Sequence, residues 1–333
     1  MQESKHPEIV VITGAGAGLG RAIACAFARR GASIGLLSRG EDRLEDARRE
    51  VESLGGTAVC IPTDVSDADA VERAAAQVEQ QFGPIDTWVN NAMTTVFSPV
   101  REMQSDEYRR VTEVTYLGVV YGTQAALRRM LPRDRGTVVQ VGSALAYRSI
   151  PLQSAYCAAK HAIVGFTDSL RSELIHDGSN VHVTVVHMPA LNTPQFTWCK
   201  SRMPRMAQPV PPIFQPEVGA EAVYWAAHKR EREVLVGWPT AQAVWGQRFI
   251  PGLLDRYLAS QAWDGQMTDE PDPHNRPFDL YEPAPGHQGA KGRYMDRSRP
   301  SGPPPWLTTH VGAVAAAAGA AVLGVAAAAF RRG

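Results

Sequence analysis

The sequence predicts an α/β protein built on one doubly wound parallel sheet of about seven strands. Short runs rich in β-branched residues alternate with segments of helical periodicity from about residue 8 to residue 237. A glycine-rich turn follows the first of these runs and leads directly into a helical segment. Strands that alternate with helices form a parallel sheet covered on both faces, and right-handed crossovers make such a sheet doubly wound.

The alternation predicts where each strand and helix lies, and the strand ends then mark where a ligand could bind. In a doubly wound sheet, ligands bind at the carboxyl ends of the strands, so the residues that follow each strand are candidates for a binding site. The expected helices include residues 20–31, 41–54, 68–82 and 154–176. The expected strands are Ile9–Thr13, Ser33–Ser38, Thr57–Pro62, Thr87–Asn90, Thr137–Ser143, Val181–His187 and Glu233–Gly237.

Composition divides the 333 residues into three parts. Residues 1–263 form the predicted α/β domain. Residues 264–305 are dense in Pro, Gly, Asp and Arg and poor in aliphatic side chains, so we expect a disordered linker. Residues 306–333 form an apolar tail, in which 311–330 is uncharged and long enough to cross a bilayer. Because alanine and glycine dominate the tail, a transmembrane helix and a helix that pairs with another helix both remain open.

Charge and cysteine usage exclude several classes of protein. Lys plus Arg and Asp plus Glu both number 34, so the chain has no overall basic field to attract nucleic acid. The four cysteines are far apart and lack ligand spacing, which favours reduced structural thiols over a disulfide frame or a metal site. Residues 1–8 lack the apolar stretch of a signal peptide. We therefore expect the α/β domain to be cytoplasmic, with the tail as a candidate membrane anchor.

The glycine-rich turn is a candidate phosphate site. Residues 13–20 read TGAGAGLG, between the first strand and the first helix. Glycines let the backbone approach a pyrophosphate closely, and the free N–H groups at a helix start attract anions. This position in the chain therefore favours a nucleotide over a plain turn.

The residues that follow the next strands indicate which nucleotide binds. Ser38 and Arg39 stand where an NAD-binding protein would place an acid for the ribose 2′-hydroxyl. An arginine there favours the 2′-phosphate of NADP, so we expect NADP, with NAD as the weaker alternative. Asp64, Val65 and Asn91 follow the third and fourth strands and face the same edge of the sheet.

Tyr156 and Lys160 are four residues apart in YCAAK and therefore share one face of a helix. A free tyrosine has a pKa of about 10. A lysine ammonium about 4–5 Å away is expected to lower that pKa by about 2–3 units, which would suit the phenol to acid–base catalysis. Ser143 ends the fifth expected strand, where its hydroxyl could hydrogen-bond a substrate carbonyl.

The motifs TGAGAGLG, NNA, Ser143 and YCAAK, in this order, resemble the short-chain dehydrogenase/reductase family, whose members are NAD(P)-binding Rossmann-fold oxidoreductases. The resemblance covers about residues 8 to 240. It implies hydride transfer between NADP and a small-molecule alcohol or carbonyl, and a homo-oligomer. It also implies cofactor contacts by Thr13, Gly14, Gly18, Leu19, Gly20, Ser38, Arg39, Asp64, Val65, Asn91, Tyr156, Lys160, Pro189, Asn192 and Thr193.

Three positions depart from the family pattern. Met93 replaces the glycine of NNAG, and Ala190 replaces the glycine of Pro-Gly. Thr115 stands where the family carries a catalytic asparagine that supports the proton relay. These departures keep a cofactor-binding protein without turnover as one alternative, and the apolar tail keeps a membrane-tethered interaction module as another.

A long Pro-rich and aromatic stretch, residues 194–214, follows the sixth strand. In the family this region closes over the substrate, so an apolar lid and a lipophilic substrate are implied. Packing of the same side chains on the domain's own surface is equally compatible with the sequence.

Overall fold

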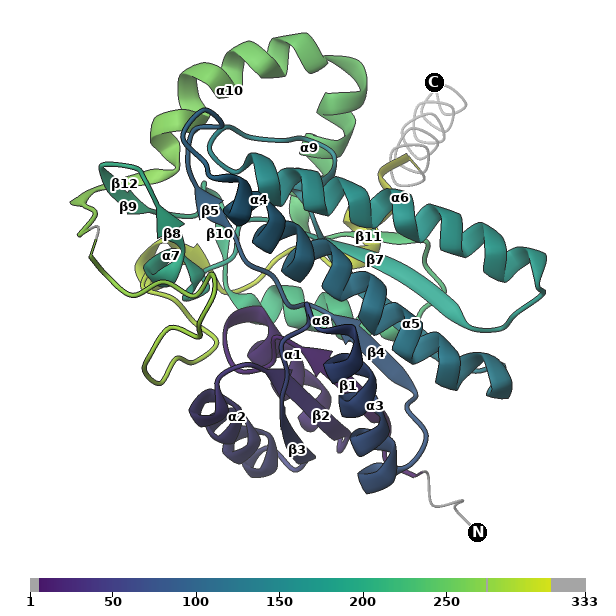
Figure 1. Cartoon of the computed structure of the whole chain (residues 1–333). Coiled ribbons are helices and arrows are strands. Elements are labelled where there is room, and N and C mark those ends of the chain that lie inside the picture. Colours follow the sequence, from purple (N-terminus) through teal and green to yellow (C-terminus); the bar gives the residue numbers. More distant parts are fainter. Residues whose placement is uncertain (1–5, 274, 313–333) are drawn as a thin grey trace, which may run out of the picture.

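Seven parallel strands form the central sheet, in the order β11-β7-β6-β4-β1-β2-β3 (Figure 1). This computed structural model describes residues 6–273 and 275–312. The predicted α/β fold class is confirmed, and each of the seven expected strands is present within two residues of its expected ends. The strands are β1 (Ile9–Thr13), β2 (Ser33–Ser38), β3 (Thr57–Pro62), β4 (Thr87–Asn90), β6 (Thr137–Ser143), β7 (His182–Met188) and β11 (Glu233–Leu235).

Helices cover both faces of the sheet. The helices α1 (Gly18–Ala28), α2 (Glu41–Ser53) and α8 (Pro216–Ala227) contribute to the core on one face. The helices α3 (Ala68–Phe82), α5 (Gly118–Met130) and α6 (Ser154–His176) contribute to the core on the other. Both cores are needed because a parallel sheet buries both of its faces.

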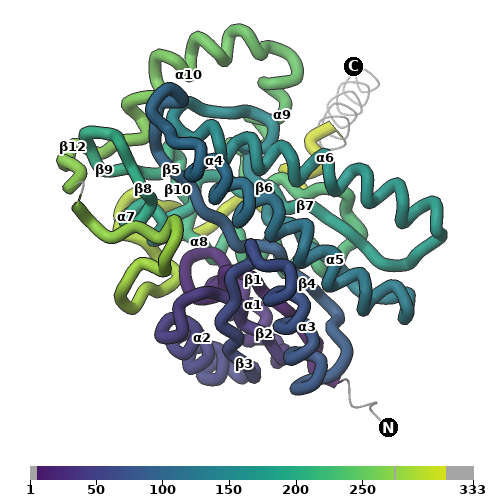
Figure 2. The backbone as a smooth tube through the Cα atoms, in the orientation of Figure 1, coloured from purple at the N-terminus to yellow at the C-terminus, as the bar shows by residue number. Residues whose placement is uncertain are grey.

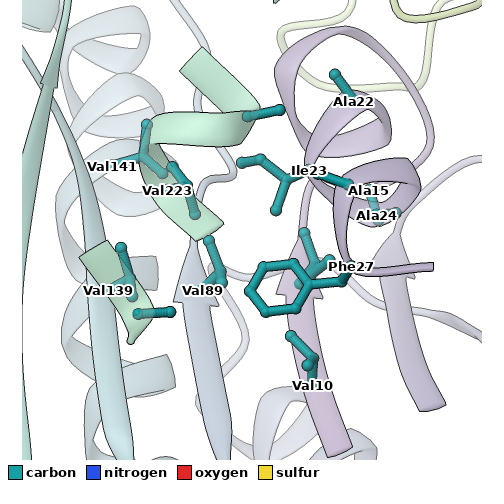
Figure 3. Close-up of a cluster of buried hydrophobic side chains, with 14 of the residues drawn as sticks. Val10, Ala15, Ala22, Ile23, Ala24, Phe27, Val89, Val139, Val141 and Val223 are labelled. Atoms are coloured by element: carbon teal, nitrogen blue, oxygen red, sulfur yellow. The ribbon is translucent and has the colours of Figure 1, made fainter. Parts of the chain in front are cut away.

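Alternation along β1 divides its side chains between the two cores. Val10 and Ile12 belong to the core under α1 and α8, whereas Val11 belongs to the opposite core. Figure 3 shows Phe27 of α1 among strand valines, with Val223 of α8 nearby. Phe27 is fully buried, so α1 is held firmly against the sheet just after the glycine-rich turn.

Smaller elements connect or extend these strands and helices. Among them, η1 is a π-helical turn between two α-helices. The helix α10 lies at the top of Figure 1, above α4 and α9. These elements are β5 (Val96–Phe97), α4 (Ser105–Thr112), η1 (Glu113–Leu117), η2 (Leu131–Arg133), η3 (Ala144–Ala146), α7 (Gln195–Trp198), β8 (Lys200–Ser201), β9 (Arg205–Ala207), β10 (Ile213–Phe214), α9 (Gly237–Phe249) and α10 (Pro251–Gly265).

The prediction of a disordered linker at residues 264–305 is wrong for the part of this segment that the structure describes. This segment packs along the domain, beside α7 and α2 (Figure 2). Its strand β12 (Met267–Pro271) pairs with β9, and its strand β13 (Ser298–Arg299) pairs with β10. It also contains η4 (Met295–Arg297) and leads to α11 (Pro305–Thr309), which packs on β11 and α9.

The order in this segment does not come from a core of its own. Leu280 is fully buried and Tyr294 nearly so, both in clusters supplied mainly by the α/β domain. Hydrogen bonds from domain arginines to the carbonyl oxygens of Leu280 and Tyr281 add to this packing. Composition predicted disorder because it counts only what a segment can bury by itself. We call residues 279–294 the C-terminal strap.

Within residues 6–273 and 275–312, no helix combines the length and the apolar character needed to span a bilayer. Most of the apolar tail, residues 313–333, lies outside the described residues. The expected membrane helix therefore falls on a part of the chain that the structure does not describe.

Candidate active site

A cavity of about 420 Å³ lies at the carboxyl ends of the strands, at the edge of the sheet where the fold predicts a ligand site. Most of the predicted site residues line it together. They are Gly14, Gly18, Leu19, Gly20, Ser38, Arg39, Asp64, Val65, Asn91, Ser143, Tyr156, Lys160, Pro189 and Thr193. Three predicted residues, Thr13, Thr115 and Asn192, lie behind the cavity wall.

The glycine-rich turn requires glycine for close packing and for backbone conformation. Gly14 has a φ of +67°, and an added Cβ would lie 2.9 Å from the Cα of Ala92. A Cβ at Gly20 would lie 2.1 Å from the carbonyl oxygen of Gly14. The turn therefore folds tightly onto the start of α1 and onto the loop after β4.

Thr13 and Asn91 tie this turn to the loop after β4. The hydroxyl of Thr13 accepts the N–H groups of Asn91 (2.9 Å) and Ala92 (3.0 Å). The side-chain amide of Asn91 donates to the carbonyl oxygen of Thr13 at 2.9 Å. Thr13 is thus a support of the cavity rather than part of its wall, and the amide nitrogen of Asn91 is committed to the backbone.

Ser143, Tyr156 and Lys160 converge in the cavity. Ser143 ends β6, and its Oγ accepts the N–H of Leu145 at 3.1 Å and hydrogen-bonds the Tyr156 hydroxyl. Lys160 lies one helical turn after Tyr156 on α6, with its Nζ 5.5 Å from the centre of the Tyr156 ring. That Nζ donates to the carbonyl oxygen of Val141 at 2.6 Å.

The pKa values of this group differ from the sequence expectation. Burial raises the pKa of Tyr156 above its usual value, and the hydrogen bond with Ser143 only partly opposes this. Burial lowers the pKa of Lys160 to about 7. The expected lowering of the Tyr156 pKa by Lys160 is not found, because burial of the phenol raises its pKa and Lys160 is itself buried.

Thr115 lies outside the cavity wall, in the π-helical turn η1, and is fully buried. Its hydroxyl donates to the carbonyl oxygen of Thr94 (3.0 Å) and accepts the N–H of Thr94 (3.1 Å). Thr94 itself lines the cavity. Thr115 therefore acts on the site by holding the loop after β4, not by direct contact.

Positive charge gathers at the far end of the cavity. Arg39 and Arg43 both line it, and Gly16 leaves room for Arg43 and Ser38, since an added Cβ would lie 3.2 Å from the Cβ of Arg43. Asp64 is paired with Arg110 at 2.6 Å. Although burial works in the opposite direction, this hydrogen bond from Arg110 helps to keep the pKa of Asp64 below its usual value.

Asn192 was predicted to meet the cofactor, but the structure buries it completely and turns it toward the C-terminal strap. Its Oδ1 accepts the N–H of Tyr294 at 3.0 Å, and its backbone carbonyl accepts the N–H of Gly292 at 3.0 Å. Its neighbours Thr193 and Pro189 do line the cavity. The sequence does not predict this contact with residues 292–294, because residues 264–305 are expected to be a disordered linker.

Sequence reasoning missed two further residues of the wall. Arg43 lies in the first turn of α2, close in sequence to Arg39, so a second arginine just after the end of β2 could have pointed to it. Asp279 comes from the C-terminal strap, 240 residues after Arg39 along the chain. No local pattern marks Asp279 as a site residue, because only the fold brings it to the cavity.

The wall fits a phosphorylated dinucleotide. Glycine backbone lines one side, and two guanidinium groups lie at the end where Ser38 finishes β2. The Nη2 atom of Arg43 is buried and, among the described residues, has no hydrogen-bond partner. A buried guanidinium donor without a partner is costly, and an anionic ligand oxygen would satisfy it.

Comparison with known proteins agrees with this geometry. The family model described as short chain dehydrogenase matches residues 8–202. The chain is 31% identical over 295 residues to the uncharacterized oxidoreductase YxnA of Bacillus subtilis, covering 88% of this chain and 83% of that one. It is 33% identical over 263 residues to dehydrogenase/reductase SDR family member 7B of Mus musculus, covering 76% and 81%.

A solved structure shares the architecture. The alcohol dehydrogenase of the archaeon Thermococcus sibiricus, complexed with 5-hydroxy-NADP, superimposes with a TM-score of 0.59 at 29% sequence identity. The match covers 68% of this chain and 94% of that one. It therefore extends over most of the α/β domain described above.

Proposed function

The chain belongs to the short-chain dehydrogenase family, and on that premise we propose that it is an NADP-dependent oxidoreductase that interconverts an alcohol and a carbonyl, with Tyr156 as general acid and base. Membership of the family makes it an NAD(P)-dependent enzyme, so the alternative of a binding protein without turnover is disfavoured. The observation that carries the proposal is the convergence of Ser143, Tyr156 and Lys160 in one cavity with the glycine-rich turn.

The chemistry divides between cofactor and protein. When bound, the reduced cofactor supplies a hydride to the carbonyl carbon of the substrate. The Tyr156 hydroxyl gives its proton to the carbonyl oxygen, and the phenolate then recovers a proton from solvent. One carbonyl, one hydride and one proton thus give one alcohol, and the reverse sequence oxidises the alcohol.

The raised pKa of Tyr156 fits the reductive direction. Near neutral pH the phenol is protonated and can act as an acid without first gaining a proton. Ser143 shares a hydrogen bond with this hydroxyl, so a substrate carbonyl oxygen would meet two hydroxyl donors. Lys160 lies behind Tyr156 and, when charged, stabilises the phenolate that each proton transfer leaves.

The rest of the wall favours a substrate with an apolar body. Ile150, Phe196, Val210 and Leu258 line the cavity, and three glutamines add polar groups. Apolar walls with a few polar groups are typical of small-molecule sites. We therefore assign the substrate to lipophilic carbonyls or alcohols.

Cofactor oxidation tests the proposal. The purified full chain is mixed with NADPH, or with NADH, and a panel of ketones and aldehydes of increasing apolar size, while loss of cofactor absorbance is followed. The proposal expects turnover with NADPH and rates that rise with apolar size. It is rejected if NADPH binds but no member of the panel, nor any alcohol with NADP⁺, is turned over.

We also propose that the tail beyond Gly312 associates with a membrane and leaves the catalytic domain in the cytoplasm. Two features support this. The tail is apolar over residues 311–330. The last described helix, α11, packs on α9, and Phe249 at the end of α9 and Leu253 in α10 are 71% and 63% exposed. Recovery of the full-length protein wholly in the soluble fraction after detergent-free lysis would count against this proposal.

A further inference from the structure

The C-terminal strap crosses one end of the cavity. It begins beside Arg39, whose guanidinium donates to the carbonyl oxygens of Asp279, Leu280 (3.4 Å) and Tyr281 (2.6 Å). Further along, the carbonyl oxygen of Gly289 accepts the N–H of Gly18, the first residue of α1, at 3.1 Å. The strap therefore touches both the arginine that follows β2 and the glycine-rich turn.

Anchors on the domain fix the start of the strap. Arg110 of α4 donates to the carbonyl oxygen of Leu280 at 3.0 Å, and Leu280 is fully buried. The Tyr281 hydroxyl donates to a carboxylate oxygen of Asp106. Leu280 and Tyr281, the two residues that follow Asp279, are held by these contacts. Asp279 therefore has little freedom to leave the cavity wall.

Asp279 places a carboxylate among positive groups at this end of the cavity. It lines the cavity together with Arg39 and Arg43, and its N–H donates to the carbonyl oxygen of Trp198 at 3.1 Å. The guanidinium of Arg43 lies over the Trp198 ring at 4.7 Å. Asp279 and Arg43 thus pack against the same residue of α7.

We propose that Asp279 is a specificity-determining residue of the cofactor site, because its carboxylate competes with the 2′-phosphate of NADP for the positive field of Arg39 and Arg43. The inference rests on the proposed NADP-dependent function. NAD carries a hydroxyl in place of the 2′-phosphate, so this competition does not affect its binding. The strap therefore sets how strongly the protein prefers NADP over NAD.

The competition changes with pH. Burial raises the pKa of Asp279 to about 6, against the attraction of Arg39, Arg43 and Arg110. The other titratable groups in its surroundings are Asp64, which is paired with Arg110, Glu282 of the strap and the buried thiol of Cys199. Above pH 6 Asp279 is charged and opposes the 2′-phosphate, whereas below pH 6 it is neutral and the opposition is lost.

Binding measurements test this inference without turnover. The full chain and an Asp279→Asn variant are titrated with NADP⁺ and with NAD⁺ by calorimetry at pH 7.5 (roughly 1.5 units above the Asp279 pKa). We expect Asp279→Asn to bind NADP⁺ about 10-fold more tightly, as for one unit charge removed a few ångströms from the phosphate, and NAD⁺ within about 2-fold. Asp296→Asn is the matched control, because it removes an exposed carboxylate in η4, just after the strap, and should change either affinity by less than about 2-fold.

A pH series separates Asp279 from the 2′-phosphate, which itself titrates near pH 6. The ratio of NADP⁺ affinities, variant over parent, should fall from about 10 at pH 7.5 toward 1 at pH 5. If Asp279→Asn lost its native circular dichroism, Asp279→Ser would serve in its place. A ratio near 1 at pH 7.5, with NADP⁺ still preferred over NAD⁺, would overturn this inference alone. Absence of NADP⁺ binding by the parent would instead overturn the proposed function.

Discussion

The hydroxyl of Thr115 donates to the carbonyl oxygen of Thr94 at 3.0 Å and accepts the N–H of the same residue at 3.1 Å. One buried side chain thus satisfies both backbone groups of a residue in the cavity wall. This explains how a threonine can stand where the family carries an asparagine. Thr115 is a positioning residue, and it acts through Thr94.

Thr115→Val should destabilise the protein, because it keeps the shape of the side chain but leaves two buried backbone groups unpaired. Each such group costs about 1–3 kcal/mol. Thr115→Asn should be tolerated, since an amide offers both a donor and an acceptor. Denaturant unfolding and steady-state rates on one accepted substrate check both variants. We expect turnover of Thr115→Asn to equal or exceed that of the parent, and a wild-type stability for Thr115→Val would contradict the account.

Lys160→Met should flatten the pH dependence of stability. The folded protein releases the Lys160 proton near pH 7, whereas the unfolded chain keeps it up to about 10.5. Between these values the unfolded state binds more protons, so the free energy of unfolding rises with pH by at most about 1.4 kcal/mol per pH unit. The variant loses this rise, and its stability relative to the parent is greatest below pH 7.

Urea unfolding of parent and Lys160→Met at pH 6, 8 and 9.5, which straddle the Lys160 pKa, measures the difference. Lys229→Met is the control, because Lys229 is exposed. A stability difference between parent and Lys160→Met that stays constant across this range would show that Lys160 is not titrating near 7.

Arg39→Ala should remove most of the preference for NADP over NAD. A charge-assisted hydrogen bond contributes about 1.5–3 kcal/mol, which corresponds to roughly 10- to 100-fold in NADP affinity. NAD affinity should change less. Arg48→Ala serves as the control, since Arg48 is paired with Glu45 and Glu52 on α2. Equal affinities of the parent for the two cofactors would remove the basis of this prediction.

Much of the fold could be predicted from the sequence. β-branched runs and helical periodicity marked the seven strands and helix α6, because strands buried on both faces are uniformly apolar and amphipathic helices carry a regular repeat. The predicted set of Ser143, Tyr156 and Lys160 comes together because a strand end and one helix face fix its geometry.

Other features depend on tertiary contacts that no local pattern carries. The C-terminal strap is polar, and it is ordered by groups such as Arg39 and Arg110, which lie far away in the sequence. The direction of the Tyr156 pKa shift depends on how deeply the phenol is buried. The four-residue spacing predicts that Lys160 lies near Tyr156, but it does not predict how far burial removes the phenol from solvent.

Tyr156→Phe tests the central claim most directly, since it removes only the hydroxyl that transfers the proton. Parent and variant are titrated with NADPH and then mixed with a carbonyl that the parent reduces, and cofactor oxidation is followed over a single turnover. We expect NADPH affinity to change by less than about 2-fold and the rate to fall about 100-fold or more. A variant that binds NADPH normally and keeps more than about a tenth of the parent's rate would contradict the assignment of Tyr156 as the general acid.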